Sequence, residues 1–482
     1  MKLDLRHWLS AAFRPLAGAA NKATRPGPGL ALAAICLSAG LGWGQYVEGW
    51  IGVPGAWVGS LAYNSREDVL YGASEDGPFF TIRCSDNRSI AWFSLGHAYC
   101  ICYDSLDNKA YCTFTGSSAD SLAVIDGRTH FRIKALPMEG SSEPVWDPVS
   151  NRVYVSCQTT GQVAVVDCTT DSLLMYIPVG WCPMKMYINT LRRKLYVLNY
   201  DDGTVSVVDM ATNQVIKSVE VGGTPNSGYY CRRVDKFYSD GSYGTVAVID
   251  GLSDSVVTRI LLPDNGWAHS MAGDELTATV VLGVDSYVYS RVYFVHAPSD
   301  SVISTQPTGR EPSAVLVNPT SGLVYSANAM SNNVSVMTGN GSQVVNTLPV
   351  GDYPFVLKAV PRHDRIYVGH VSTGRVYVIR DTVRRRPDGQ PAVPDTATGL
   401  RLEPNPFLSC LRITCGPDVA ARRVAIWSDE GRLVRVLTQA RQGNGALRLA
   451  WDGRDSRGRQ VCSGVYFVAS DRGVRAKVVK LE

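Results

Sequence analysis

The 482-residue sequence lacks three features that would place it in common protein classes. Helical periodicity is absent from residues 45–381, which excludes a helical bundle and the helix-containing repeat solenoids. No stretch after residue 44 is apolar for as many as 18 residues, so we expect no transmembrane anchor in that part of the chain. The formal net charge is only +4, which over this length does not indicate nucleic-acid binding.

Familiar catalytic and metal-binding motifs are also missing. The chain contains no Gly-x-Ser-x-Gly, His-Glu-x-x-His, phosphate-loop or dinucleotide-binding motif. No Cys-x-x-Cys pair or mixed His/Cys set has the spacing of a zinc site. We therefore expect neither a metal nor a cofactor, and enzymatic activity becomes the less favoured interpretation.

What the chain does contain is one pattern repeated about every 42 residues between residues 50 and 381. A clear copy is KLYVLNYDDGTVSVVD at residues 194–209, and similar copies occupy residues 152–167 and 323–337. A period of this size predicts stacked or radially arranged units. Gly-x-x-Pro steps precede the copies at residues 180–183, 222–225, 309–312 and 351–354.

One repeat, residues 176–216, shows what each unit should form. Residues 184–189 are an apolar-biased run, and residues 194–200 alternate as a strand does. An Asp-Asp-Gly turn then leads into the β-branched run 204–208, and a last strand begins at Gln214. Four short antiparallel strands in about 42 residues are the unit of a β-propeller, whose radial closure hides the sheet edges.

The number of units is expected to be eight, with seven as the alternative. The sixth unit is the most divergent, and Asp274 and Glu275 are expected to lengthen one of its loops. The third strands of the eight units are expected to end at or near Cys84, Asp126, Asp167, Asp209, Asp250, Ile303, Met337 and Asp381.

The repeats resemble the YVTN family of β-propellers, whose name echoes the segments YVLN (Tyr196 to Asn199) and YSAN (Tyr325 to Asn328). The resemblance covers about 330 residues. It implies the propeller fold for residues 45–382 but says little about activity, which must be argued from the site.

Residues 1–44 have the pattern of an export signal. Lys2, Arg6 and Arg14 belong to a positively charged lead, and Leu30 to Leu41 form an apolar core. Small residues before Gln45 suit a cleavage site. We therefore expect an exported protein, located at the cell surface or outside the cell.

A second module follows the repeats. Residues 383–399 contain three prolines and an Arg-Arg-Arg run, which indicates an exposed linker. Residues 400–482 contain short strands at 424–428, 447–451 and 465–470, separated by turns rich in Gly and Asp. A segment of roughly eighty residues with this pattern predicts a small β-sandwich of the immunoglobulin (Ig) type.

This segment resembles the C-terminal sorting domain of bacterial type IX secretion and the Ig-like fold of the flagellar hook-capping protein. The resemblance implies a passenger of the secretion machinery, carried across the outer membrane. The alternative is a sandwich that only packs on the propeller. The residues that carry the resemblance include Pro404, Asn405, Pro406, Phe407, Gly431, Trp451, Asp452, Gly453, Gly464 and Tyr466.

Export permits disulfides, and two pairs are candidates. Cys100 and Cys112 flank a predicted turn at 104–108 and are candidates for a cross-strand pair. Cys410 and Cys415 are the second candidate pair. Buried free thiols are the alternative for both.

Aspartates recur where the third strands end. Metal binding is one interpretation, but we favour hydrogen bonds from the side chain to amides of the following turn. For the same reason Asp452 and Asp455 are expected to form a turn rather than a calcium loop. The recurring aspartates are Asp126, Asp167, Asp209, Asp250 and Asp381.

The Gly-x-x-Pro steps lead into the innermost strands, so their variable residues should rim one mouth of the central channel. These positions are rich in aromatic and acidic residues, which suits a carbohydrate or small polar ligand. The alternative is that they only plug or solvate the mouth. The candidates are Trp57, His97, Glu143, Trp181, Thr224, Trp267, His269, Glu311, Asp352 and Tyr353.

The functional expectation is an exported protein that binds an extracellular ligand, either a glycan or a protein. One alternative is a propeller hydrolase or lyase that acts on glycans or lactones with carboxylates from different units, for example Glu143 with Glu311. A second alternative is a structural envelope or adhesion component.

Overall fold

The computed structural model is all-β. Apart from the two short 3-10 turns η2 (Ala329–Ser331) and η3 (Pro361–His363), the regular structure of the described residues consists of strands. None of these turns is long or apolar enough to cross a bilayer. The structure describes residues 44–115, 120–241, 244–262, 266–286, 289–385, 400–403, 409–415, 423–428, 432–438, 447–470 and 475–480.

Several expectations fall outside these residues. They are the export signal before Gly44, the linker beyond residue 385, the run Pro404 to Phe407, and Gly431.

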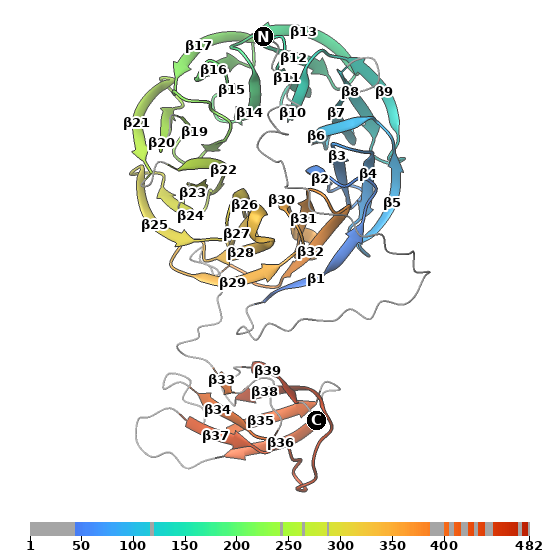
Figure 1. Ribbon diagram of the computed structural model, residues 1–482, viewed down its shortest axis with the longest axis vertical. Coiled ribbons are helices and arrows are strands. Elements are labelled where there is room, and N and C mark those ends of the chain that lie inside the picture. The colour runs from blue at the N-terminus through green and yellow to red at the C-terminus, as the bar shows by residue number, and fades with distance from the viewer. Residues whose placement is uncertain are drawn as a thin grey trace, which may run out of the picture. The chain divides into compact units, whose positions relative to one another are not determined.

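Between residues 45 and 381, four-stranded antiparallel sheets lie side by side in a ring around a centre (Figure 1). We number them in chain order. Sheet 1 contains β2 (Val58–Asn64), β3 (Val69–Ser74), β4 (Phe79–Arg83) and β5 (Arg88–Phe93). Sheet 2 contains β6 (His97–Asp104), β7 (Lys109–Thr115), β8 (Asp120–Asp126) and β9 (Arg132–Pro137). Sheet 3 contains β10 (Ser141–Asp147), β11 (Arg152–Cys157), β12 (Gln162–Asp167) and β13 (Ser172–Pro178). Sheet 4 contains β14 (Pro183–Asn189), β15 (Lys194–Asn199), β16 (Thr204–Asp209) and β17 (Gln214–Glu220).

Four further sheets complete the ring. Sheet 5 contains β18 (Gly228–Cys231), β19 (Lys236–Asp240), β20 (Thr245–Asp250) and β21 (Ser255–Leu261). Sheet 6 contains β22 (Trp267–Asp274), β23 (Thr279–Asp285), β24 (Ser290–His296) and β25 (Ser301–Pro307). Sheet 7 contains β26 (Pro312–Val317), β27 (Val324–Asn328), β28 (Asn333–Met337) and β29 (Val344–Pro349). Sheet 8 contains β30 (Pro354–Val360), β31 (Arg365–His370), β32 (Arg375–Asp381) and β1 (Gln45–Gly52).

Sheet 8 joins the two ends of this region. Strand β1 pairs antiparallel with β32, from Gln45 opposite Asp381 to Gly52 opposite Arg375. The Gln45 amide also donates to Asp381 Oδ1 at 3.1 Å. The first strand is therefore the outermost strand of the last sheet, so the ring has no open edge at this junction.

The burial pattern explains why the repeats read as valine-rich strands. In sheet 4, the middle strands β15 and β16 are buried along nearly their whole length, because neighbouring sheets cover both faces. The innermost strand β14 alternates one buried residue with two half-buried ones. The repeated tyrosine is a core residue: the largest fully buried side chains include Tyr71, Tyr111, Tyr154, Tyr196, Tyr238, Tyr325 and Tyr367.

Neighbouring sheets are also linked by a recurring polar contact at one end of the ring, which we call the latch end. The turn before an outermost strand carries a residue with positive φ, a conformation that Asn, Asp and His tolerate. Its side chain contacts a Tyr or Lys on the second strand of the preceding sheet. Asp300, for example, accepts from Tyr238 Oη at 2.7 Å and from Lys236 Nζ at 2.5 Å. These latch residues are Asn87, His130, Asp171, Asn213, Asp254 and Asp300.

The strand-end aspartates form turns, as expected. Asp126 Oδ1 accepts from the amides of Arg128 and Thr129, and Asp250 Oδ1 accepts from two amides in the same way. Asp167, Asp209 and Asp381 each accept at least one amide of the following turn. This confirms the structural interpretation of these residues.

Sheet 6 was misread from the sequence. Its third strand is β24, which ends at His296, whereas Ile303 lies on the outermost strand β25. Asp274 and Glu275 do not lengthen a loop: they begin the same short turn between first and second strands that other sheets have. The alternating residues 301–307 resembled a third strand because the real one, Ser290 to His296, lacks the usual terminal Asp.

Neither candidate disulfide is present. Cys100 and Cys112 are free, because a bulge in β6 places Ile101 opposite Cys112. Cys410 is free and exposed. Cys415 ends the extended strand β34, so the backbone positions of Cys410 and Cys415 are about 16 Å apart at about 3.3 Å per residue. A disulfide requires Cα atoms within about 7 Å.

The C-terminal part contains two antiparallel sheets. One has the strands β33 (Leu400–Glu403), β34 (Leu411–Cys415) and β37 (Leu447–Trp451). The other has β36 (Leu433–Thr438), β35 (Arg423–Ser428), β38 (Gly464–Ser470) and β39 (Arg475–Lys480). Residues of both sheets form one core, in which Trp451 contacts Tyr466 edge-on at 5.1 Å between ring centroids.

The turn after β37 is built as the sequence predicted. Asp452 Oδ1 accepts from the Arg454 amide, and Asp455 Oδ1 accepts from the amides of Arg457 and Arg459. Gly453 has a φ of 70°, and Gly464 begins β38. The turn-forming interpretation of Asp452 and Asp455 is therefore confirmed.

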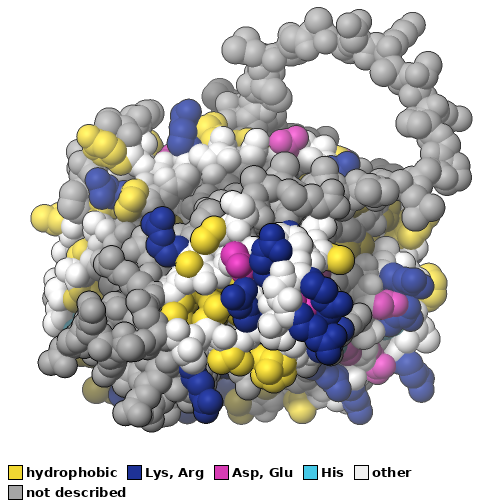
Figure 2. Space-filling model, turned by 90° about the horizontal axis from the view of Figure 1, so that it is seen from below, with side chains coloured by type: hydrophobic (Ala, Val, Ile, Leu, Met, Phe, Trp, Pro, Cys, Tyr) yellow, Lys and Arg dark blue, Asp and Glu magenta, His cyan; other side chains and the backbone are white. Residues whose placement is uncertain are grey.

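Apolar side chains are exposed on the outer face of the second C-terminal sheet. Trp427 and Phe467 lie opposite each other on β35 and β38, and both are exposed, as are Leu433 and Val436. In the space-filling view, Lys and Arg side chains lie among hydrophobic ones, with few acidic side chains between them (Figure 2).

Candidate functional site

The ten predicted mouth residues all lie at the end of the ring opposite the latch end, where the innermost strands begin or have just begun. We call this the mouth end. The Gly-x-x-Pro steps of sheets 4 and 7 are held by the loop between the second and third strands of their own sheet. The Trp181 amide donates to Asp202 Oδ2 at 2.7 Å, and the Arg310 amide donates to Ser331 Oγ at 2.8 Å. The backbone is therefore anchored while the side chains vary.

The predicted residues differ in their exposure. Trp181 is 63% exposed, and His97, Thr224, His269 and Asp352 are exposed as well. Trp57, Glu143, Trp267, Glu311 and Tyr353 are half-buried.

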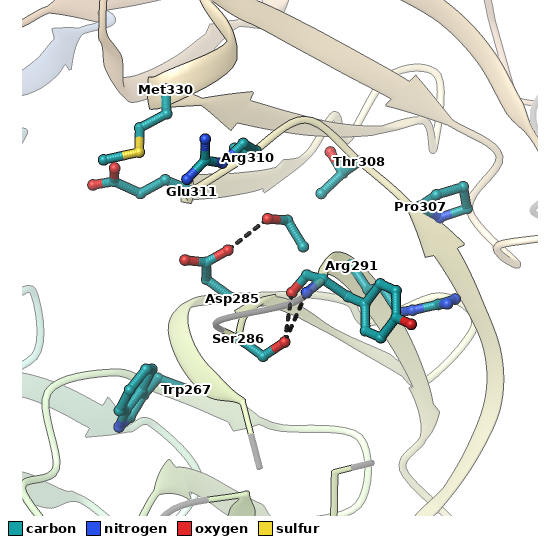
Figure 3. A pocket seen from close by; sticks show the side chains of 11 residues that line it. Trp267, Asp285, Ser286, Arg291, Pro307, Thr308, Arg310, Glu311 and Met330 are labelled. Carbon is teal, nitrogen blue, oxygen red and sulfur yellow. Dashed lines mark hydrogen bonds between the residues drawn. The ribbon is translucent and has the colours of Figure 1, made fainter. Parts of the chain in front are cut away.

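The structure brings two of the ten together in one pocket. Trp267 at the start of β22 and Glu311 just before β26 line a cavity of about 480 Å³ between sheets 6 and 7 (Figure 3). Tyr353 Oη donates to Glu311 Oε2 at 3.1 Å, so a third predicted residue supports the pocket. Glu143 and Glu311 do not meet, because sheets 3 and 7 lie on opposite sides of the ring (Figure 1).

Most of the pocket lining was not predicted. It comes from the β23–β24 turn, from the segment between β25 and β26, and from η2. The β23–β24 hairpin has seven residue pairs where β15–β16 has six, so it projects further toward the mouth end. That extra length was the available signal. The missed lining residues are Asp285, Ser286, Tyr289, Ser290, Arg291, Pro307, Thr308, Arg310 and Met330.

The pocket walls are fixed by local hydrogen bonds. Asp285 Oδ1 accepts from Ser290 Oγ at 2.5 Å, and the turn is closed by the Ser286 amide, which donates to the Tyr289 carbonyl at 2.8 Å. On the opposite wall, Thr308 Oγ1 donates to Asn328 Oδ1 at 2.7 Å. Figure 3 shows Asp285 between Trp267 on one side and Glu311 with Met330 on the other.

The charged side chains of this pocket have no ion-pair partners among the described residues. Asp285, Glu311, Arg291 and Arg310 form no ion pair with any described residue; Arg291 instead lies over the Tyr289 ring at 5.4 Å. Burial raises the pKa of Glu311, and the negative charge of Asp285 raises it further. The hydrogen bond from Tyr353 lowers the pKa and partly offsets these two effects. Asp285 and Glu311 are therefore close enough to repel one another.

A second set of charged groups lies at the mouth end, near the starts of innermost strands and the ends of second strands. Burial raises the pKa of Glu143 to about 7, and Lys185 on β14 partly opposes this. Burial likewise raises the pKa of Asp240 to about 7, against hydrogen bonds from the amides of Ser227 and Asn226. Burial and the neighbouring Asp76 raise the pKa of Glu75 to about 7. Lys185, Asp240 and Glu75 were not predicted, because the sequence does not show which loops face inward.

Within the described residues, no group of three or more His, Cys, Asp or Glu side chains is arranged to hold a metal ion. The mouth end therefore offers hydrogen-bonding and aromatic groups to a ligand.

No protein-family model matches the chain, and no curated protein matches it. Among solved structures, the chain is similar to the computationally designed protein Ika8, with a TM-score of 0.56 and 14% identity over 68% of this chain and 98% of that one. It is also similar to hydrazine synthase of Kuenenia stuttgartiensis, with a TM-score of 0.47 and 17% identity over 59% and 96% of the two chains. The similarity to Ika8 concerns the fold alone.

Proposed function

We propose that this protein is an exported, eight-bladed β-propeller that binds an extracellular ligand at its mouth end. The pocket between sheets 6 and 7 carries this proposal, because it combines an aromatic side chain with unpaired charged groups in one cavity. A cavity of about 480 Å³ is within the roughly 300–1,000 Å³ range of small-molecule sites. In this proposal, sheets 1–8 are the blades of the YVTN-like propeller.

The C-terminal part has a different task in this proposal. Residues 400–482 form an Ig-like sorting module that the secretion machinery recognises, and the segment before Gln45 directs export. Support comes from the two sheets around one core and from the place of Trp451 and Tyr466 inside that core. The protein then acts at the cell surface or outside the cell.

The experiment is a retention assay with the full chain. Immobilised polysaccharides and extracellular proteins are the test surfaces, and a variant with both Trp267→Ala and Glu311→Ala is compared with the unmodified chain. We expect at least one surface to retain the protein and the double variant to be released. Trp181→Ala is the matched control, because it removes an exposed tryptophan from the same kind of step outside the pocket. Retention that is unaffected by the double change would refute the proposal.

A second candidate function is hydrolysis or elimination on a glycan or lactone. It is favoured by Asp285 and Glu311, which line the same cavity, rather than by Glu143 with Glu311. One carboxyl with a raised pKa beside a second carboxyl is an arrangement used in acid–base catalysis. Turnover of a glycan or lactone that is lost in Glu311→Gln, while binding is kept, would support it.

A further inference from the structure

The charges of the pocket between sheets 6 and 7 restrict the chemistry of its ligand. Two carboxylates, Asp285 and Glu311, and two guanidinium groups, Arg291 and Arg310, line one cavity without pairing with each other. Elsewhere in the ring, opposite charges that approach one another do pair, as Lys109 with Asp171 at 2.9 Å and Lys194 with Asp254 at 2.7 Å. Asp285 and Glu311 each use one carboxylate oxygen, for the bonds from Ser290 and Tyr353, so the other oxygen of each and the two guanidinium groups remain for a ligand.

The sum of these charges is zero, so the pocket has no net charge that would select a purely anionic or purely cationic ligand. An acidic sugar would be attracted by the two arginines but repelled by Asp285 and Glu311, and for a polyamine the two contributions are reversed, so in both cases they oppose each other. A hydroxyl group is different, because it donates to a carboxylate and accepts from a guanidinium. A ligand that carries several hydroxyls can satisfy all four groups without bringing a charge into the cavity.

The apolar part of the lining points in the same direction. Trp267 is half-buried on one side of Asp285, and Tyr289 and Met330 are each 51% exposed at the pocket. A flat aromatic face next to hydrogen-bonding groups suits the apolar face of a sugar ring. The exposed side chains also leave the cavity open on one side, so the end of a longer chain can enter.

We propose that this pocket binds an uncharged sugar unit of an oligosaccharide or polysaccharide. The ring of the sugar stacks on Trp267, its hydroxyls donate to Asp285 and Glu311, and Arg310 donates to a sugar oxygen. This inference rests on the proposed binding function and specifies the ligand class for the same site.

The test is isothermal titration of the full chain with soluble trisaccharide probes. Cellotriose, laminaritriose, maltotriose, mannotriose and N,N′,N″-triacetylchitotriose are the neutral sugars, and trigalacturonate is the acidic sugar. Free lysine and glutamate are the ionic amino-acid probes. We expect at least one neutral trisaccharide to bind, with an affinity that salt leaves unchanged, because no charge is screened.

Trp267→Ala should weaken that binding roughly tenfold or more, since stacking and burial on an aromatic ring are lost. Glu311→Gln should weaken it several-fold while the hydrogen bond from Tyr353 is kept, which tests the site without a large change in packing. Trp92→Ala, which removes an exposed tryptophan from the outermost strand β5, should leave the affinity unchanged.

The outcomes separate this inference from the proposed function. Binding of trigalacturonate or an amino acid that is lost in Trp267→Ala, with no neutral sugar bound, would overturn the neutral-sugar assignment but keep the pocket as a binding site. Absence of any probe or surface whose binding depends on Trp267 and Glu311 would overturn both.

Discussion

The latch end and the mouth end of the ring use charged residues in opposite ways. At the latch end, Asp147 accepts from Arg193 at 2.6 and 2.7 Å; burial works against these bonds, but the net result is a lowered pKa for Asp147. At the mouth end, burial raises the pKa values of Glu75, Glu143 and Asp240 to about 7. Each end has one exception. At the mouth end the pKa of Asp76 is lowered despite burial, and at the latch end burial raises the pKa of Asp104.

This difference indicates that, within one repeat, the latch end stabilises the fold and the mouth end carries the residues available for function. At the latch end, the turn before the outermost strand repeats a polar side chain (Asn, Asp or His) in six of the sheets, because that side chain joins one sheet to the preceding one. The four Gly-x-x-Pro steps at the mouth end keep their glycine and proline but change the residues between them. The mouth end therefore retains charged groups that do not contribute to folding, which is typical of functional sites.

The largest effect should come from breaking a latch. Asp300→Ala removes the carboxylate that pairs with Lys236 and leaves Lys236 and the Tyr238 hydroxyl with only the Ala297 carbonyl as acceptor. The site is mostly buried, since the Lys236 and Asp300 side chains are 18% and 13% exposed. Removing one partner of such a pair should cost about 3 kcal/mol of unfolding free energy, measured by urea denaturation. Asp86→Ala, which breaks the exposed Arg83–Asp86 pair, is the control and should leave stability nearly unchanged. Equal effects of the two changes would show that the latches do not join the sheets.

A smaller change in the free energy of unfolding is expected at the mouth end, where a substitution should stabilise the protein and not destabilise it. The folded protein holds the Glu143 proton up to a pKa of about 7, compared with the ordinary 4.5. The stability gained by protonation is complete below the ordinary value and is lost as the pH rises through about 7. Glu143→Gln, which stays neutral, should therefore be more stable than the unmodified protein by about 1–3 kcal/mol at about pH 8.5.

The same substitution should give no gain at about pH 4.5, where both forms are neutral in the folded state. Urea midpoints at the two pH values provide the measurement. A gain of equal size at both values would mean that the charge of Glu143 is not the cause.

The smallest effect is expected for a single turn at the latch end. Asp167 accepts from the amide and the hydroxyl of Thr170 at 2.9 and 3.0 Å, and chiefly the amide bond lowers its pKa. Its contribution is present above the ordinary pKa of 3.8 and is lost as the pH falls below it. Asp167→Ala should cost about 1 kcal/mol near neutral pH and almost nothing in acid. Asp201→Ala, at an exposed turn residue, serves as the control, and an acid-independent loss in Asp167→Ala would contradict the assignment.

The sequence predicted the strands better than it predicted the site. The β15 and β16 strands were foreseen almost to the residue, because their valines are buried on both faces and a turn with Gly203 separates them. Sheet 6 was misread because β24 lacks the terminal aspartate that marks five of the third strands. The predicted Cys100–Cys112 disulfide was wrong because a bulge in β6 shifts the strand register, and the sequence does not show this bulge.

Only part of the pocket lining could be predicted from the sequence, for a related reason. Trp267 and Glu311 stand at the repeated steps and could be found by aligning the units. Asp285, Arg291 and Arg310 could not, because their proximity depends on how far one hairpin projects and on how two sheets meet. Pairing Glu143 with Glu311 failed on geometry as well, since sequence does not show which sheets face each other across the ring.

The pairing of β1 with β32 has a consequence for how the protein is made. The partners Gln45 and Asp381 are separated by 336 residues, so the pairing between them cannot form until nearly the whole ring of sheets has been synthesised. Until then, β1 has no partner and the edge of β32 is uncovered, a state in which strands pair with the wrong chain. A bulky protein fused just before Gln45 should therefore slow the pairing of β1 with β32. The same protein inserted at an exposed turn in one of the sheets from the middle of the chain should not.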